Sequence, residues 1–254
     1  MPARNHYGQG IGLDGSQGNA FFDFVRIARV KKPRALFLEN VRNILSIDHG
    51  NTFSSIRQTL EQELGYEFHY AIIDSSTTVP QRRKRCYIVA FREWGGQFEF
   101  PDFSGSLLPL KSILEYQVPE KYTISDRLWN SHLQRSQRNR ARGTGFTVKL
   151  ADVNEPSPTL VARYGKDGKE CLIPQVGKNP RKLTPLECER LQGFPAGFIS
   201  ASSDTSSYRE FGNAVTVPVV AKIGASIVQA LSRLEAISAG KPNRLSDKDK
   251  CRVF

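Results

Sequence analysis

The first ninety residues alternate between apolar positions with helical spacing and short apolar runs. Apolar residues from Phe21 to Val30 recur at helical intervals, and Lys31-Lys32-Pro33 then predicts the end of a helix. The continuous run from Ala35 to Leu38 is typical of a buried parallel strand. Helical spacing returns from Phe53 to Leu64, and Gly65 is suited to end that second helix.

Two strand candidates follow the second helix, from Phe68 to Ile73 and, with a clearer pattern, from Tyr87 to Phe91. Strand, helix and strand therefore alternate over residues 21–92, which predicts an α/β layer with a largely parallel sheet. Residues 1–20 are rich in Gly, Asn and Gln and show no periodicity, so we expect a mobile loop there.

The pattern changes after about residue 96, where prolines and strand-and-turn signals replace the helical stripes. A dense basic stretch runs from Gln134 to Gly143. We therefore expect the residues up to about Gln175 to form a smaller, irregular and mostly β domain.

Two further helices are predicted after this region. Thr184 suits the N-cap, Pro185 the first helical position and Glu187 the reciprocal partner of a capping box. A long amphipathic stripe from Val215 to Leu234 predicts the last helix, which needs a sheet to pack against and is expected to return to the α/β domain. Residues 238–254 are expected to form a flexible basic tail.

Charge and cysteine use restrict the class of protein. The chain has 36 Lys and Arg against 25 Asp and Glu, a net charge of +11, which favours nucleic-acid binding, although solvated basic faces would give the same composition. No apolar run of about 18 residues occurs, so no membrane span is predicted, and the polar N-terminus is not typical of a signal peptide. The 4 cysteines lack C-x-x-C spacing and the 4 histidines lack ligand spacing, which predicts no metal site and a reducing, cytoplasmic setting.

Charged residues gather near two of the predicted strands. Glu39 stands at the carboxyl end of a strand, where α/β folds place ligands, although a carboxylate there more often caps the next helix. Arg83 and Arg85 precede the later strand and would point to the same side of an extended segment. We expect their guanidiniums to converge beside Glu39 and to bind a phosphate or a base carbonyl, while Arg82 and Lys84 face the other way.

Four segments, in their order along the chain, carry a family resemblance. They are Phe37-Leu38-Glu39-Asn40-Val41, Pro80-Gln81-Arg82-Arg83-Lys84-Arg85, Arg181-Lys182-Leu183-Thr184-Pro185-Leu186-Glu187 and Phe211-Gly212-Asn213-Ala214-Val215. Together they resemble the second part of a DNA (cytosine-5)-methyltransferase, over residues 5 to about 235. The Pro-Cys nucleophile and the Gly-rich cofactor loop of that family are absent. The resemblance implies an incomplete Rossmann-like S-adenosylmethionine-dependent methyltransferase domain with an inserted small, mostly β target-recognition domain.

The resemblance also implies roles for motif residues. Glu39 takes the position that hydrogen-bonds a flipped cytosine at N3, and Arg83 and Arg85 flank it near the O2 edge of the base. This arrangement suits the chemistry, because addition of a thiolate at C6 pushes charge towards N3. The implied cofactor is S-adenosylmethionine. The residues at the positions that line its pocket are Asn213, Ala214 and Val215.

Two segments between these motifs, from Glu115 to Phe146 and from Pro158 to Gly168, resemble the recognition region of Dcm-type enzymes, which methylate the inner cytosine of CCWGG or CCNGG sites. Double-stranded DNA is therefore the implied partner. Each single cation in this region contacts the phosphate backbone more often than a base. The residues that we expect to bind DNA are Ser16 and Gln17 of the mobile loop, Thr159 and Leu160 beside the flipped base, and Arg142, Arg163 and Lys166.

The expected domains are a partial catalytic α/β domain (residues 1–95), a target-recognition domain (96–205) and a C-terminal helix that returns to the catalytic domain (206–237). Three hypotheses follow. The chain is part of a split or truncated cytoplasmic, nucleoid-associated enzyme of the restriction–modification type, inactive without an N-terminal methyltransferase partner. Alternatively, it is a DNA-binding module without chemistry, or it is a gene remnant with exposed sheet edges and low solubility.

Overall fold

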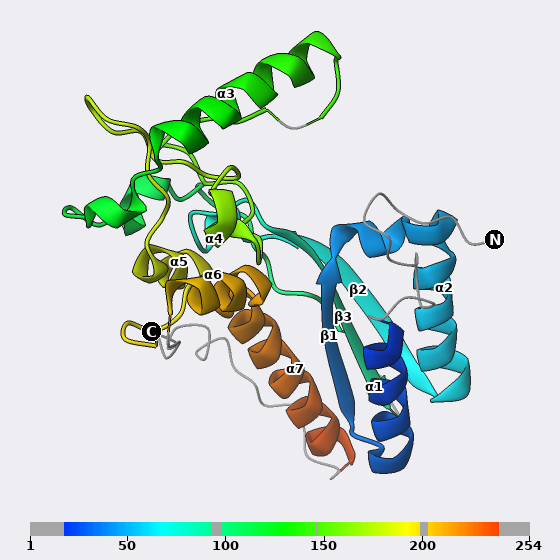
Figure 1. Cartoon of the computed structure of the whole chain (residues 1–254). Coiled ribbons are helices and arrows are strands. Elements are labelled where there is room, and N and C mark those ends of the chain that lie inside the picture. Colours follow the sequence, from blue (N-terminus) through cyan, green and yellow to red (C-terminus); the bar gives the residue numbers. More distant parts are fainter. Residues whose placement is uncertain (1–17, 93–97, 146, 199–202, 239–254) are drawn as a thin grey trace. The chain divides into compact units, whose positions relative to one another are not determined.

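The computed structural model describes residues 18–92, 98–145, 147–198 and 203–238 (Figure 1). Contacts between residues divide this part of the chain into two units. Unit 1 contains the described residues up to Ile72, residues 85–101 and those from Lys222 onward, and unit 2 contains residues 73–84 and 102–221. This division differs from the expected boundaries at residues 95 and 205, because residues 73–84 and 206–221 group with unit 2.

Unit 1 is an α/β unit built on a three-stranded sheet with the order β1-β3-β2. The three predicted strands are confirmed with wider bounds, as β1 (Ala35–Val41), β2 (Tyr66–Asp74) and β3 (Lys84–Arg92). The two helices predicted before β1 and β2 are also confirmed, as α1 (Gly18–Lys31) and α2 (Asn51–Gln58). After α2 the chain continues through a π-helical turn, Thr59–Glu63, and Gly65 has the left-handed φ of 72° that the sequence suggested.

The direction of the strands differs from the prediction. β1 and β3 pair antiparallel, with Ala35 opposite Phe91 and Val41 opposite Arg85, so the prediction of a parallel sheet is wrong for this pair. Only the nine residues 75–83 separate β2 from β3, whereas a parallel crossover needs about a dozen residues or more. A connection this short does not allow β2 and β3 to run parallel. The middle strand β3 also runs antiparallel to β1.

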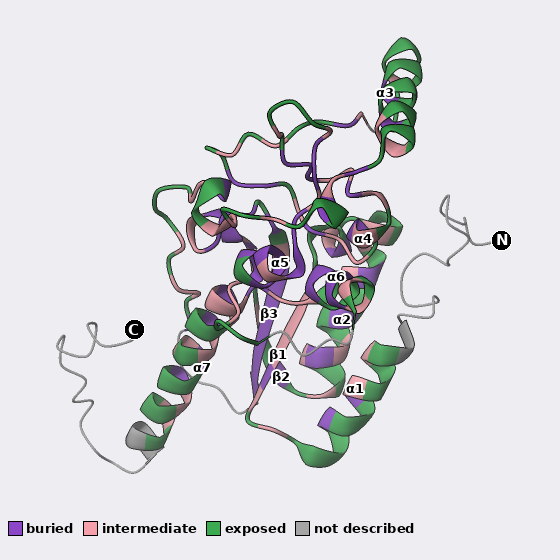
Figure 2. Ribbon diagram, turned by 60° about the vertical axis from the view of Figure 1, so that its left-hand side comes forward, coloured by how far each residue is buried: buried purple, intermediate pink, exposed green. Residues whose placement is uncertain are grey.

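The core of unit 1 lies on β3, which is buried on both faces (Figure 2). Cys86, Ile88 and Ala90 point to one face and pack in a cluster with residues such as Leu36 and Leu60. The residues between them, which point to the other face, are also buried, with exposures of 2% or less. Burial on both faces explains why this strand is a continuous apolar run in the sequence.

The last predicted helix is confirmed as α7 (Val217–Ser238), and its residues from Lys222 onward belong to unit 1. In unit 1, Arg34 forms an ion pair with Glu235 and also donates to the carbonyl of Leu231 at 3.5 Å. The stretch Asp204–Glu235 is long and apolar enough, by length and composition alone, to cross a membrane. Core helices meet the same criterion, and Ile223 and Ile227 of α7 are buried.

Unit 2 is mostly helical and irregular. Apart from the ends of β2 and β3, its described residues form only isolated β-bridges, so the prediction of a mostly β domain is wrong for this part of the chain. Its helices are α3 (Asp126–Ala141), α4 (Tyr164–Asp167), α5 (Pro185–Gln192) and α6 (Asp204–Asn213). The basic stretch at 134–143 lies mainly in α3, because Ser125 caps a segment that contains neither Gly nor Pro.

Candidate functional site

The charged pair Glu39–Arg85 lies near the end of β1, within unit 1. In the antiparallel register Glu39 is opposite Tyr87 and Val41 is opposite Arg85, so Glu39 and Arg85 are diagonal neighbours on one face of the sheet. Arg85 Nε lies 3.0 Å from Glu39 Oε1, and the two side chains are 13% and 24% exposed. The predicted proximity of these two residues is confirmed. The Glu39 carboxylate is thus oriented by the Arg85 guanidinium and remains partly accessible to solvent.

The described cysteines are core residues. Burial, followed by the negative charge of Glu39, raises the pKa of Cys86 to about 11. Burial also raises the pKa of Cys171 to about 12 and the pKa of Cys188 well above its usual range. A nucleophilic cysteine needs an accessible thiolate, which a lowered pKa favours. None of these three described thiols meets that requirement, as the sequence suggested for Cys86 and Cys188.

Arg83 has a different environment from the one that strand periodicity predicted. It precedes β3, and its amide closes a turn onto the Gln81 carbonyl at 3.1 Å, so the two-residue alternation does not extend to it. Its buried guanidinium donates to three backbone carbonyls of unit 2. These acceptors are Leu160 O at 2.9 Å, Gly212 O at 3.2 Å and Ala214 O at 2.8 Å. Arg83 therefore connects two distant segments through their main chains.

Gln81 makes a second connection of the same kind and was not among the predicted site residues. Its side chain is fully buried, and its Oε1 accepts a hydrogen bond from the Leu160 amide at 2.8 Å. Its Nε2 donates to Leu191 O at 3.2 Å and to Gln192 Oε1 at 3.3 Å. The sequence feature that could have indicated this role is the position of Gln81 within the motif, between Pro80 and Arg82.

Thr159 and Leu160 are held against the segment 81–83. Thr159 Oγ1 donates to the Arg82 carbonyl at 2.7 Å, and the Thr159 side chain is partly exposed. Leu160 is only 2% exposed and belongs to the core of unit 2. The predicted DNA contact through the Leu160 side chain is therefore contradicted, because that side chain faces the core.

The predicted cofactor-lining residues lie at the C-terminal end of α6. Asn213 ends the helix with an exposed side chain, and Ala214 and Val215 are half-buried. A Cβ added to Gly212 would lie 2.3 Å from the backbone of residues 161–162. Only glycine allows this approach, so the motif packs main chain to main chain against the segment after Leu160.

The other predicted DNA-binding residues lie on separate segments. Arg142 is exposed at the end of α3, and Lys166 is exposed in α4. Arg163 is exposed, and its Nε lies 3.6 Å from Glu170 Oε1. Ser16 and Gln17 lie outside the described residues.

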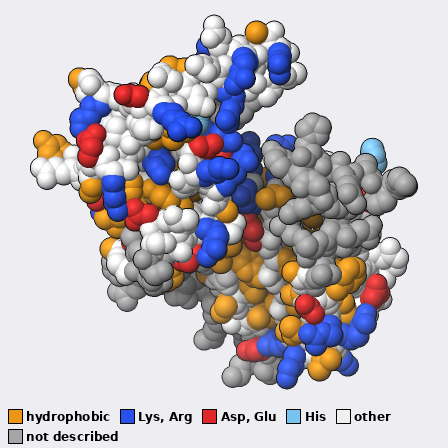
Figure 3. Space-filling model, viewed as in Figure 1, with side chains coloured by type: hydrophobic (Ala, Val, Ile, Leu, Met, Phe, Trp, Pro, Cys, Tyr) orange, Lys and Arg blue, Asp and Glu red, His pale blue; other side chains and the backbone are white. Residues whose placement is uncertain are grey.

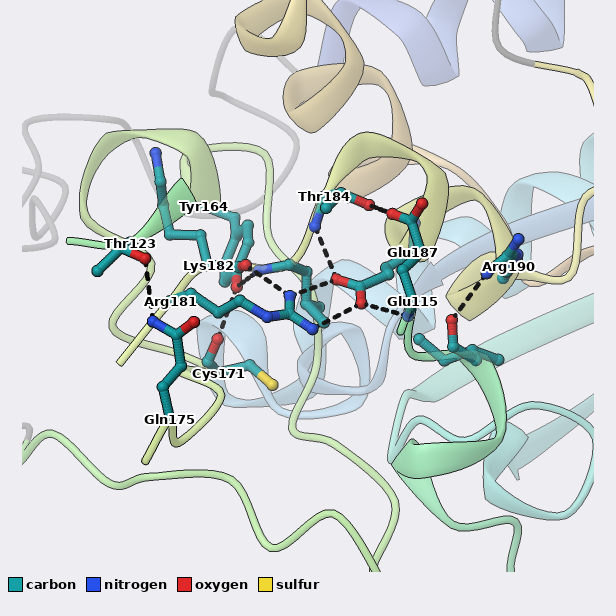
Figure 4. Close-up of polar contacts among 12 residues, drawn as sticks. Glu115, Thr123, Tyr164, Cys171, Gln175, Arg181, Lys182, Thr184, Glu187 and Arg190 are labelled. Carbon is teal, nitrogen blue, oxygen red and sulfur yellow. Dashed lines mark hydrogen bonds and ion pairs between the residues drawn. The ribbon is translucent and has the colours of Figure 1, made fainter. Parts of the chain in front are cut away.

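A buried ion pair stabilises the region around α5 (Figure 4). Arg181 donates to both carboxylate oxygens of Glu187, at 2.7 and 2.8 Å. Glu187 also accepts from the backbone amides of Thr184 at 2.8 Å and Glu115 at 2.9 Å. The Thr184 side chain in turn accepts from the Glu187 amide, which confirms the predicted capping box. The charged side chains of Arg181 and Glu187 therefore bind groups within the fold, which gives this motif a structural role.

Comparisons with known proteins identify the family of the chain. The family model described as C-5 cytosine-specific DNA methylase matches residues 6–229. Type II methyltransferase M.SsoII from Shigella sonnei is 47% identical over 226 residues, which are 87% of this chain and 59% of that protein. A DNA-cytosine methyltransferase from Escherichia coli (strain K12) is 38% identical over 247 residues, covering 82% of this chain and 52% of that protein. The chain thus spans less than two thirds of the length of these relatives.

The crystal structure of S. pombe Dnmt2 methyltransferase superposes with a TM-score of 0.67 and 16% identity, covering 85% of this chain and 74% of that one. At this identity the likeness shows the α/β fold alone. The family match covers both Glu39 and the segment 211–215. The chain belongs to the C-5 cytosine-specific DNA methylase family.

Proposed function

We propose that the chain supplies the base-binding and DNA-recognition parts of a DNA cytosine-5 methyltransferase. The reaction transfers a methyl group from S-adenosylmethionine to C5 of a cytosine that has left the double helix. The Glu39–Arg85 pair carries this proposal, because it offers a carboxylate and a guanidinium side by side at the end of a strand. One acceptor edge and one donor edge are what recognition of a cytosine base requires.

Glu39 is proposed to face N3 of the flipped cytosine. Addition of a nucleophile at C6 places negative charge on N3, and a carboxyl group within hydrogen-bond reach neutralises it. Arg85 orients Glu39 and offers further donors to the carbonyl O2 of the base. Arg83 acts as a positioning residue, because its hydrogen bonds hold the segments around residues 160 and 212–214.

The thiol nucleophile of this reaction is proposed to come from outside these 254 residues. None of the cysteines in the sequence follows a proline, and burial raises the pKa values of the three in the described part. A partner subunit or an N-terminal half with the Pro-Cys and Gly-rich motifs would supply both the thiol and the rest of the sheet. We propose that the chain alone is inactive and that the complete enzyme works on chromosomal DNA in a bacterial cytoplasm.

S-adenosylmethionine supplies the methyl group when bound. The residues after α6 fit one edge of such a ligand, because Asn213 presents an exposed amide beside the half-buried Ala214 and Val215. The amide can donate and accept hydrogen bonds, and the two apolar side chains can contact a nucleoside. These residues are proposed to line only part of the cofactor site, with a second segment from the N-terminal half supplying the rest.

The proposed target is a CCWGG- or CCNGG-like site, as in the Dcm-type branch. Thr159 is held beside the segment 81–83 with its side chain partly exposed. The exposed cations Arg142, Arg163 and Lys166 are proposed to contact guanine edges or phosphates.

Transfer of a labelled methyl group to duplex DNA tests the proposed function. We would compare the chain alone with the chain mixed with an N-terminal half that carries the Pro-Cys motif, and we expect transfer only in the mixture. In the mixture Glu39→Gln should lower the rate by about 10²–10⁴-fold, the contribution of a positioned acid or base. Glu61→Gln is a matched control, because Glu61 also pairs with an arginine at 3.0 Å in unit 1, on a helical surface.

Transfer by the chain alone would contradict the external nucleophile. Absence of transfer in both samples would contradict the enzymatic role and favour the second candidate, a DNA-binding module without chemistry. The net charge of +11 is the observation that supports this alternative. A binding module would show salt-dependent binding with site preference and no methyl transfer in any mixture.

A further inference from the structure

Helix α3 is a strongly basic helix of unit 2, and only one of its faces packs against the rest of the unit. The helix buries only His132 and Ser136 of its sixteen residues. His132 Nε2 lies 3.0 Å from the Asp167 carbonyl, and Ser136 Oγ accepts from the Val148 amide at 2.7 Å. The remaining faces are mainly exposed, as Figure 2 shows. An exposed helix with so few apolar contacts has an unpartnered surface.

Four arginines share one exposed side of α3. Arg127, Arg135, Arg138 and Arg142 are separated by eight, three and four residues. At 3.6 residues per turn these spacings place all four within an arc of about 80°. Each is exposed, and Figure 3 shows Lys and Arg side chains over this helix. We call these four residues the arginine stripe.

The arginine stripe has no compensating acids. Asp126 is the only acidic residue of α3, and no member of the stripe forms an ion pair with any residue in the described part of the chain. Arg140 lies on the other side of the helix, because two residues rotate the side chain by about 200° from Arg138. Uncompensated like charges repel one another, so the stripe is suited to a partner with regularly spaced negative charges.

We propose that the arginine stripe binds the phosphate backbone of double-stranded DNA and supplies sequence-independent affinity. Four arginines spread over fifteen residues of helix cover about 22 Å, a length over which a DNA strand presents several phosphates. This inference rests on the proposed function, since it assumes that DNA is the partner. The inference assigns phosphate binding to α3 and leaves contact near the target base to the segment around Thr159.

The stripe is suited to phosphates rather than bases. Base reading by arginine needs a guanidinium oriented towards two acceptors of a guanine. An additional contact to the same guanidinium, such as an ion pair with a carboxylate, usually fixes that orientation. The stripe has no acidic partner among the described residues. Flexible cations without such partners bind diffuse negative charge. Lysine should therefore replace arginine here, whereas it should not replace an arginine that reads a base.

Salt-dependent DNA binding tests the inference on the full chain. The triple variant R127Q/R135Q/R138Q should reduce the slope of log K against log[salt] by about 2.7, since each phosphate contact contributes about 0.9. The loss should be equal for duplexes with and without a CCWGG site. The corresponding triple lysine variant should keep the wild-type slope. Circular dichroism checks that the helix remains formed in every variant.

Arg138→Gln and Arg140→Gln form a matched pair, because both residues are exposed in the last turn of the same helix. We expect Arg138→Gln to reduce the slope by about 0.9 and Arg140→Gln to leave it unchanged. An unchanged slope in the triple glutamine variant, or loss limited to the site-containing duplex, would overturn the inference while leaving the proposed function intact. Failure of the wild-type chain to bind any duplex would overturn the inference and the recognition role together.

Discussion

Replacing Arg83 with methionine removes a buried donor group while keeping most of the side-chain volume. The Arg83 side chain is 3% exposed, and its terminal nitrogens donate to the carbonyls of Leu160, Gly212 and Ala214. Methionine would leave these three acceptors without their donor. Because the acceptors belong to two segments far apart in sequence, their mutual position should become less well defined.

The expected loss is about 3–5 kcal/mol. A hydrogen bond from a charged donor contributes about 1.5–3 kcal/mol, so three such bonds set an upper limit of about 4.5–9 kcal/mol. Two of the bonds share Nη2, and removal of a buried charge recovers part of its desolvation cost. Each buried carbonyl left without a donor costs about 1–3 kcal/mol, and because two of the three bonds share one nitrogen the expected total is about 3–5 kcal/mol.

Urea unfolding followed by tryptophan fluorescence and circular dichroism measures this loss. With an m-value of about 3 kcal/mol/M, the midpoint of Arg83→Met should fall by about 1–1.7 M. Arg82→Met is the matched control, because the neighbouring Arg82 pairs with Glu155 while both side chains are about half exposed, at 49% and 53%. An exposed pair contributes about 0–1 kcal/mol. Equal midpoints for the two variants would refute the structural role of Arg83.

Two further predictions concern packing and pH. Gly212→Ala should cost about 3 kcal/mol in thermal unfolding, the upper end for overpacking, because its Cβ would lie 2.3 Å from backbone atoms, whereas Gly224→Ala in α7 has nothing within 4 Å and should not destabilise. Stability should fall at alkaline pH, since burial raises the pKa of Cys86 from 9.0 to about 11. The unfolded state then loses its proton first, so this contribution is complete below about pH 9 and is lost as pH rises to about 11. Denaturant titrations from pH 9 to pH 11 should show a smaller fall in the free energy of unfolding for Cys86→Ala than for the wild type. An equal fall would contradict a contribution of Cys86 to the loss of stability.

Features set by local chemistry were predictable from the sequence. The capping box from Thr184 to Glu187 and the left-handed glycine at Gly65, with a φ of 72°, depend on residues only a few positions apart. The strands were predictable from continuous apolar runs, because β3 is buried on both faces. The proximity of Glu39 and Arg85 was predicted from strand periodicity and from the position of Glu39 at a strand end, and the antiparallel register supplies its physical reason.

Features that depend on non-local contacts were not predictable. The strand direction depends on the short connection between β2 and β3, which the alternation of helix and strand does not reveal. Helix α3 has almost no apolar stripe, so its periodicity was too weak to recognise, and the cap at Ser125 was the usable signal. The role of Arg83 depends on the turn before β3, because β3 begins at Lys84 and the Arg83 guanidinium donates to backbone carbonyls instead of lying beside Glu39.

The hydrogen bonds of Gln81 and Arg83 have a consequence for how this chain can diverge. Both side chains bind main-chain groups of Leu160, and Arg83 also binds those of Gly212 and Ala214. A main-chain carbonyl is present whichever amino acid occupies the position. A substitution of an exposed residue next to these attachment points therefore leaves the attachment itself in place. The same property makes the stretch after Ser157 a natural place at which recombination, or deliberate exchange between relatives, can install a new surface on an unchanged frame.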